Sequence, residues 1–253
     1  MIKIENTEVY GWEAAIRGMR NPMNSWDKSD TVYGTYWGDI DGHQCVDEHG
    51  FSIGKNDLDL MKRLRNAGTD HRKFMRMITV TADIVAPIYW WAEYDTYKIG
   101  TVANSCSKMH KLLSKPFEIS DFSFDKLPGF RNDIINGKYK YIENKNTFEE
   151  VAKPLINILN ELRDSYFSCE SEMNKKVIWY SIIQLLPSSY NQRRTVMLNY
   201  EVLTNIYHAR KNHMLDEWHD FCHWVETLPY AKELIIGEEN DAYFNARILG
   251  RAG

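Results

Sequence analysis

Apolar residues in the first third of the chain recur with two different periods, and each period predicts a different element. Residues 14–19 are apolar at helical spacing, and so are residues 58–64, where Gly68 suits the left-handed cap that ends a helix. Ile2–Ile4 reads as a short strand. Residues 78–84 alternate strictly between apolar and polar side chains, which predicts a strand with one buried face.

Residues 87–100 predict a helix, because the segment opens with proline, which suits the first helical position, and closes with glycine. Helical spacing places Trp90, Tyr94 and Tyr97 on one face of it. Residues 101–107, which follow, are small and polar. They offer many hydrogen-bonding groups and little core, so we expect a binding loop there.

The rest of the chain reads as helices joined by irregular segments. Glycine and proline predict irregular insertions near 26–54 and 116–146. Helices are predicted at about 148–169 and 175–186, and the apolar stripe of residues 199–225 predicts one last long helix. The length of 253 residues suits one large domain or two small ones.

The last predicted helix carries charged residues inside its apolar stripe. Steps of four and three residues from Leu203 reach Arg210 and then Glu217. Seven residues span two helical turns, which is too far for the simplest direct ion pair. Two interpretations of Arg210 stay open: a structural charge at the edge of the stripe, or the residue that binds a charged ligand.

Composition narrows the classes of partner. The 253 residues carry 31 basic and 35 acidic side chains, for a net charge of −4, so we expect no long nucleic acid and no membrane as a partner. The basic clusters at 71–73 and 193–194 read as solvated faces.

Neither a signal pattern nor a membrane-spanning apolar run is present, which predicts a cytoplasmic protein. The 33 aromatic residues fit either stacking surfaces and an interface or a large core.

Cysteine and histidine spacing predicts neither disulfides nor a metal site. The four cysteines are scattered, which is typical of reduced thiols. Two small sets were considered as metal ligands, and neither has the spacing of a four-ligand zinc site: His43, Cys45 and His49, and His219, Cys222 and His223. The sequence also lacks the glycine-rich loops of Rossmann and Walker phosphate sites.

Two segments together resemble the flavin-dependent thymidylate synthases, flavoproteins that methylate deoxyuridine monophosphate with a folate carbon and a reduced nicotinamide. Leu186-Pro187 is followed by Asn199, Asn205 and Arg210 at the family's relative positions. The other segment is Phe74–Lys108, a strand that leads through Ala86-Pro87 into a helix. The family's Arg-His-Arg signature falls there on Thr96-Tyr97-Lys98, so the signature is rewritten.

The resemblance implies FAD as cofactor, with NADPH and methylenetetrahydrofolate as further reactants. It makes Asn199 and Asn205 flavin contacts, places Glu201 where the family has a flavin-contacting arginine, and sets Arg210 over the pyrimidine. The nucleotide would be bound by residues of the second segment: Glu93, Thr96, Lys98, Asn104, Ser105, Ser107 and Lys108. Ile183 replaces a nucleotide-binding arginine. Cys106 stands at the family's serine and is either a nucleophile or a small buried thiol.

Three functions follow as hypotheses. The first is a divergent flavoenzyme that transfers a one-carbon unit or hydride to a pyrimidine nucleotide or related small molecule, with Arg210 and Cys106 as catalytic residues. The second is a non-catalytic nucleotide-binding or assembly homologue that has lost the synthase reaction. The third is a helical scaffold whose resemblance is chance. The resemblance implies an α+β fold, a sheet with flanking long helices, in a single domain over residues 1–253. It also implies a homo-oligomer, and a tetramer in particular.

Overall fold

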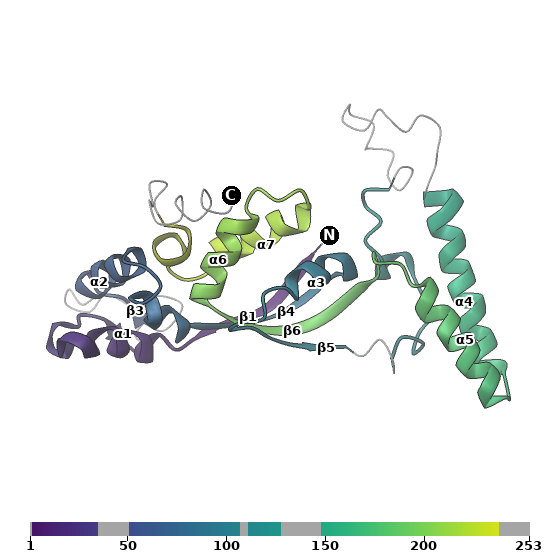
Figure 1. Cartoon of the computed structure of the whole chain (residues 1–253), viewed down its shortest axis with the longest axis horizontal. Coiled ribbons are helices and arrows are strands. Elements are labelled where there is room, and N and C mark those ends of the chain that lie inside the picture. The colour runs from purple at the N-terminus through teal and green to yellow at the C-terminus, as the bar shows by residue number, and fades with distance from the viewer. Residues whose placement is uncertain (1, 35–50, 107–110, 128–147, 238–253) are drawn as a thin grey trace, which may run out of the picture. The chain divides into compact units, whose positions relative to one another are not determined.

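The computed structural model describes residues 2–34, 51–106, 111–127 and 148–237 (Figure 1). The chain divides into two compact units. Unit 1 comprises Met1–Lys3, Ile84–Thr96 and Asn104–Thr195, and unit 2 comprises Ile4–Asp83, Tyr97–Ala103 and Val196–Gly253. A single domain over 1–253 stays a prediction.

The described residues contain six strands, which form two sheets. The larger sheet has the order β1-β4-β6-β5 and consists of β1 (Lys3–Tyr10), β4 (Thr79–Pro87), β6 (Asn191–Asn199) and β5 (Val102–Ser105). The smaller sheet is the antiparallel pair of β2 (Val32–Tyr33) and β3 (Phe51–Ser52). Together with the helices, these sheets confirm the predicted α+β class.

The described residues of unit 2 form four α-helices packed on buried aromatic and aliphatic side chains. They are α1 (Trp12–Arg20), α2 (Lys55–Asn66), α6 (Tyr200–Arg210) and α7 (Asp216–Glu226). Short turns of 3-10 helix lie at Asn21–Met23, Trp26–Lys28 and Arg72–Arg76, and a π-helix at Lys232–Ile236. Ile16 and Met19 of α1 are buried, as their spacing predicted. Gly68, just after α2, has a φ of 108°, which confirms the predicted left-handed cap.

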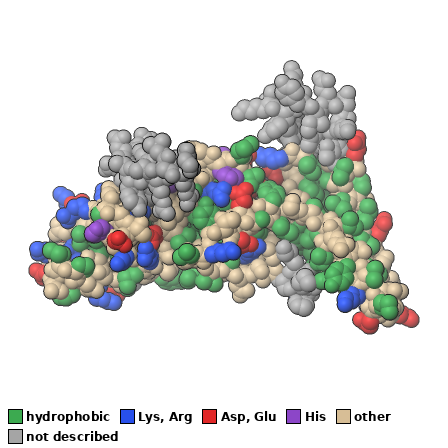
Figure 2. Space-filling model, viewed as in Figure 1, with side chains coloured by type: hydrophobic (Ala, Val, Ile, Leu, Met, Phe, Trp, Pro, Cys, Tyr) green, Lys and Arg blue, Asp and Glu red, His purple; other side chains and the backbone are tan. Residues whose placement is uncertain are grey.

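Unit 1 contains a short helix and a helical pair. They are α3 (Ile88–Tyr94), α4 (Lys153–Ser168) and α5 (Glu172–Leu185), with a π-helix at Phe148–Ala152 and a 3-10 helix at Ile119–Asp121. Helices α4 and α5 pack side by side around Ile156, Leu159 and Ile182 (Figure 1). Both were predicted. Hydrophobic side chains also gather on the surface of this pair (Figure 2). The exposed ones include Phe167, Met173, Val177 and Tyr180.

The helix predicted over 87–100 is shorter than expected and ends at Tyr94. The hydroxyl of Thr96 donates to the carbonyl of Glu93 at 2.7 Å, and the backbone N–H of Thr96 donates to the same carbonyl at 3.1 Å. Such local bonds replace the next helical turn. Trp90 and Tyr94 are buried on the helix as predicted, but the expected place of Tyr97 on that face is wrong.

Two further element predictions need correction. The expected binding loop over 101–107 contains strand β5. The β-branched Val102 favours an extended backbone, and the segment pairs with β6 in the larger sheet. Strand β6 is the second correction, because no element was predicted over its residues. The buried residues of β6, Gln192, Val196 and Leu198, alternate with exposed or half-buried neighbours, as in any strand with one buried face. Polar side chains and two arginines hide this alternation in the sequence.

The expected single helix over 199–225 is two helices, α6 and α7. The break follows from local polar bonding, because the ring Nδ1 of His213 accepts from the backbone N–H of Leu215 at 3.2 Å. Met214, which the predicted stripe included, is 96% exposed. The two basic clusters are not wholly solvated either, since Arg72 is buried and Arg194 is largely covered.

No helix in the described part of the chain has the length and apolar content that crossing a membrane requires.

Candidate functional site

The residues that the sequence singled out fall into two groups, one in each unit. Unit 2 contains Lys98, Asn199, Glu201, Asn205 and Arg210. Unit 1 contains Glu93, Thr96, Asn104, Ser105 and Cys106. Ser107 and Lys108 lie outside the described residues. Each group is therefore built from its own unit.

In unit 2, Arg210 is the last residue of α6 and lies against two aromatic rings. Its Nε donates to the phenol oxygen of Tyr97 at 2.8 Å. The guanidinium carbon lies 4.9 Å from the ring centroid of Trp218 and 5.5 Å from that of Tyr97. These distances are those of cation–π contacts, so the rings and the phenol orient the half-buried charge. Because α6 ends at Arg210, Glu217 lies on a different helix, α7. The two-turn spacing along one helix therefore does not apply to Arg210 and Glu217.

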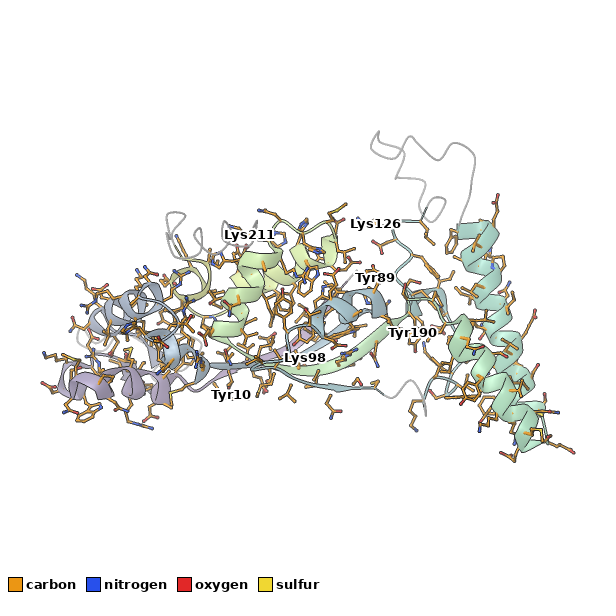
Figure 3. The ribbon with its side chains drawn as sticks, viewed as in Figure 1. Tyr10, Tyr89, Lys98, Lys126, Tyr190 and Lys211 are labelled. Carbon is orange, nitrogen blue, oxygen red and sulfur yellow. The ribbon has the colours of Figure 1, made fainter. Side chains whose placement is uncertain are left out.

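Tyr97 is the central residue of the rewritten triplet, and the structure brings it to Arg210. Lys98 beside it is exposed (Figure 3). Tyr97 also meets Trp218 edge to face, with ring centroids 6.2 Å apart. The sequence had placed Tyr97 with the core aromatics of a helix, whereas in unit 2 it holds the arginine that the resemblance marks.

Asn199 caps the N-terminus of α6 and is fixed from two sides. Its side-chain oxygen accepts from the backbone N–H of Val202 at 3.0 Å. Its amide nitrogen lies against Gly100, where an added Cβ would come within 2.8 Å of it. Gly100 has a φ of +75°, which also favours glycine. The oxygen is therefore committed to the helix cap, and the amide N–H donors have a fixed direction.

The carboxylate of Glu201, one residue into α6, pairs with Arg76. Arg76 Nε donates to one carboxylate oxygen, and Nη2 lies 3.3 Å from the other. The Glu201 side chain is 11% exposed and that of Arg76 47%. The charged group open to solvent at this position is therefore the guanidinium of Arg76 and not the carboxylate of Glu201. Asn205 lies on the same helix with an exposed side chain.

In unit 1, Arg194 links α3 to β6. Its guanidinium lies 4.2 Å from the ring centroid of Trp91 and donates to Asp95 at 2.6 Å. Its Nε donates to the side-chain oxygen of Gln192 at 3.1 Å. The side chain is 14% exposed, so Arg194 is held by packing and hydrogen bonds and is not the solvated charge that the sequence suggested.

The same network fixes the backbone at Cys106. The side-chain amide of Gln192 donates to the Cys106 carbonyl at 2.9 Å, and the Cys106 N–H donates to the Arg193 carbonyl at 3.0 Å. The thiol of Cys106 is exposed. The expectation of a small buried thiol is therefore wrong, because the strand that ends here lies open to solvent.

Cys106 lines a cavity of about 320 Å³ that lies within unit 1. Tyr190, labelled in Figure 3, lies immediately before β6 and is part of the same wall. Burial raises the pKa of the Tyr190 phenol, so it is a hydrogen-bond donor at neutral pH. The basic side chains of the lining are Lys111, Lys115 and Arg193. None of the three was singled out as a site residue from the sequence.

A second hollow, of about 490 Å³, lies in unit 2 beside α7 and includes His213, His219 and His223. Cys222 lies at its base, where burial raises the pKa of the thiol to about 12. Among the described residues, no three histidine, cysteine or acidic side chains are placed to hold a metal ion. The other set considered from the sequence, around Cys45, lies outside the described residues.

Comparison with solved structures identifies the fold. Thymidylate synthase X (ThyX) from Helicobacter pylori, solved with FAD and dUMP, matches with a TM-score of 0.58 and 19% sequence identity, over 93% of this chain and 97% of its own. A second structure of that flavin-dependent enzyme, also complexed with FAD and dUMP, covers 92% and 97% with the same score and identity. No protein-family model matches the chain, and no curated protein matches it by sequence.

A third solved structure shares the fold and is that of a different enzyme. The UMP/dUMP methylase PolB from Streptomyces cacaoi, bound with 5-Br dUMP, matches over 90% of this chain and 89% of its own. Its TM-score is 0.55 and its sequence identity 14%. The chain therefore has the ThyX fold, as the resemblance predicted, although its signature residues differ.

Proposed function

We propose that this protein is a flavoenzyme that transfers a one-carbon unit or a hydride to a pyrimidine nucleotide. The proposal rests on the Arg210–Tyr97 contact, on a fold shared with a thymidylate synthase solved with FAD and dUMP and with a UMP/dUMP methylase solved with 5-Br dUMP. A bound reduced flavin supplies the hydride or carbon equivalents. The chain supplies orientation and charge, through Arg210 above all. NADPH and methylenetetrahydrofolate are the proposed further reactants, and a homotetramer the proposed assembly.

The residues of α6 fit a flavin. Asn199 presents fixed amide donors, because its oxygen is used by the helix cap and its nitrogen lies against Gly100. Asn205 is exposed on the same helix. At Glu201, where the resemblance implied a cationic contact, the exposed charge is the guanidinium of Arg76. We propose that Arg76 supplies the positive charge there and that Glu201 orients it, instead of contacting the flavin.

Incubation with FAD is expected to give the protein visible flavin absorbance, and dUMP or UMP is expected to raise its melting temperature. A ligand at about 100 times its Kd adds about 2.7 kcal/mol to the free energy of unfolding. The measurements are the visible spectrum after gel filtration and a thermal-shift series with pyrimidine and purine monophosphates. A colourless protein that no pyrimidine nucleotide stabilises would remove the proposal.

Replacing Asn199 with aspartate is expected to weaken FAD binding at least tenfold without lowering stability. Aspartate keeps the oxygen that accepts from Val202 and is an equally good N-cap, but it lacks the amide donors. Asn199→Ala is the comparison, because it also removes the cap, at about 1 kcal/mol. FAD titration and urea unfolding separate the two effects. Unchanged FAD affinity in N199D would leave Asn199 as a helix cap only.

A further inference from the structure

The turn between α6 and α7 is held by a series of three hydrogen bonds that starts at Arg210 and ends at Trp218. The carbonyl of Arg210 accepts from the backbone N–H of His213 at 2.9 Å. The ring Nδ1 of His213 accepts from the backbone N–H of Leu215 at 3.2 Å. The carbonyl of Leu215 then accepts from the backbone N–H of Trp218 at 3.1 Å. The middle bond depends on a side chain, whereas the other two join backbone groups that any residue can supply.

Apolar packing contributes little to this turn. Lys211, Asn212 and Met214 are exposed, and His213 and Leu215 are half-buried. Hydrogen bonds therefore decide where α7 begins relative to the end of α6. Because the imidazole accepts from the N–H two residues ahead, it makes the bond that an asparagine makes in an Asx-turn. The bond requires a bare Nδ1, so the proton of the neutral ring is on Nε2.

The turn matters because it places the aromatic ring on which Arg210 lies. Trp218 is fully buried near the start of α7, and its ring centroid is 4.9 Å from the guanidinium carbon of Arg210. The ring of His213 meets Trp218 edge to face, with centroids 6.3 Å apart. Arg210 Nε donates to the phenol oxygen of Tyr97. An arginine side chain has many rotamers, so the guanidinium keeps one direction only while both of its contacts are in place.

We propose that His213 is a positioning residue for Arg210. Its Nδ1 fixes the turn between α6 and α7 and thereby holds the Trp218 ring against the guanidinium. This inference rests on the proposed function, in which Arg210 supplies the charge that orients the nucleotide. His213 acts through Arg210 and needs no contact of its own with nucleotide or flavin. A displacement of about 1 Å at a reacting centre can cost about 100-fold in rate, so a turn outside the site is sufficient to control it.

Two substitutions separate the acceptor of His213 from its ring. His213→Asn keeps an acceptor at the place of Nδ1 and removes the ring from Trp218. His213→Phe keeps a ring there and has no acceptor. We expect His213→Asn to retain kcat/KM for nucleotide methylation within about threefold, and His213→Phe to lower it by about tenfold or more. His223→Phe makes the same change at an exposed position of α7 and is the matched control.

Combination with Arg210→Ala decides whether His213 acts through the arginine. In that background His213→Phe is expected to change kcat/KM and dUMP affinity by less than about twofold, because the group that it positions is gone. A role in folding alone predicts instead that the two effects multiply. The measurements are steady-state kinetics and dUMP calorimetry on the full chain loaded with FAD, beside the melting temperature of each variant. If His213→Phe does not fold, His213→Ala replaces it as the variant without an acceptor.

Three outcomes would overturn the inference: a folded His213→Phe variant with the kcat/KM and dUMP affinity of the wild type, a His213→Asn variant that loses as much as His213→Phe, and effects that multiply in the Arg210→Ala background. In each case the wild type still binds FAD and dUMP, and the proposed function stands. A wild-type chain that binds neither overturns the proposed function and this inference with it, so the two failures are distinguishable.

Discussion

Replacing Asp57 with asparagine is expected to lower the free energy of unfolding by about 3–5 kcal/mol, because it leaves a buried arginine without its counter-charge. Asp57 is fully buried in α2, and Arg20 of α1 is 4% exposed. Arg20 Nε donates to one carboxylate oxygen at 2.7 Å. The other oxygen accepts from the hydroxyls of Ser29 and Thr31 and from the N–H groups of Asp30 and Thr31.

The matched control is Asp59→Asn, which removes the same charge from an exposed position of the same helix. Urea unfolding of both variants measures the difference. A loss below about 1 kcal/mol in D57N would contradict the prediction, because it would mean that the five donors relax around a neutral amide.

Asp57 also predicts how stability depends on pH. Burial by itself raises the pKa of this carboxyl, but the hydrogen bonds from Thr31, Ser29 and Arg20 outweigh it and hold the pKa below its ordinary value of 3.8. The contribution of Asp57 is therefore complete above pH 3.8 and is lost as the pH falls through the lower folded-state pKa. D57N is expected to lose this part of the acid dependence and D59N to keep it.

Periodicity predicted the parts of the fold whose cores are apolar. The buried face of β4, the helix α1 and the helical pair α4 and α5 all follow from spacing alone. It failed where polar bonds decide the structure. The end of α3 depends on the Thr96 hydroxyl, and the break after Arg210 depends on the His213 ring, which no apolar pattern reports.

The candidate site shows the same contrast between what the sequence pattern predicts and what contacts between distant residues decide. The sequence marked Arg210 and Asn199 as unusual, but the contacts that orient them come from Tyr97 and Gly100, about a hundred residues away. Arg76 was missed because only its pairing with Glu201 makes it relevant. A possible signal for the cavity was the spacing of Lys111 and Lys115, yet two lysines four residues apart are common on any surface.

Arg210→Ala is expected to retain FAD and to lower kcat/KM for nucleotide methylation by roughly 10²–10³-fold, the usual cost of removing one preorganised electrostatic donor. The free energy of unfolding should fall by only about 1–2 kcal/mol, because Arg210 is half-buried and a cation–π contact contributes from about 0.5 kcal/mol when exposed to about 2 kcal/mol when desolvated. Tyr97→Phe keeps the ring and removes only the 2.8 Å hydrogen bond to Arg210, so its effect on kcat/KM should have the same direction and be smaller. Steady-state assays with methylenetetrahydrofolate and NADPH, beside thermal unfolding, give both quantities.

The same two variants decide between the flavoenzyme and the non-catalytic homologue. If Arg210 organises an assembly, Arg210→Ala changes the oligomeric state in sedimentation and leaves nucleotide affinity at the wild-type value. If Arg210 faces the pyrimidine, nucleotide affinity falls while sedimentation and FAD content do not change. Tyr97→Phe then follows Arg210→Ala in affinity and not in assembly, because its hydroxyl acts only on the direction of the guanidinium. A Tyr97→Phe variant that loses oligomers but binds dUMP normally would therefore contradict the enzymatic role of the pair.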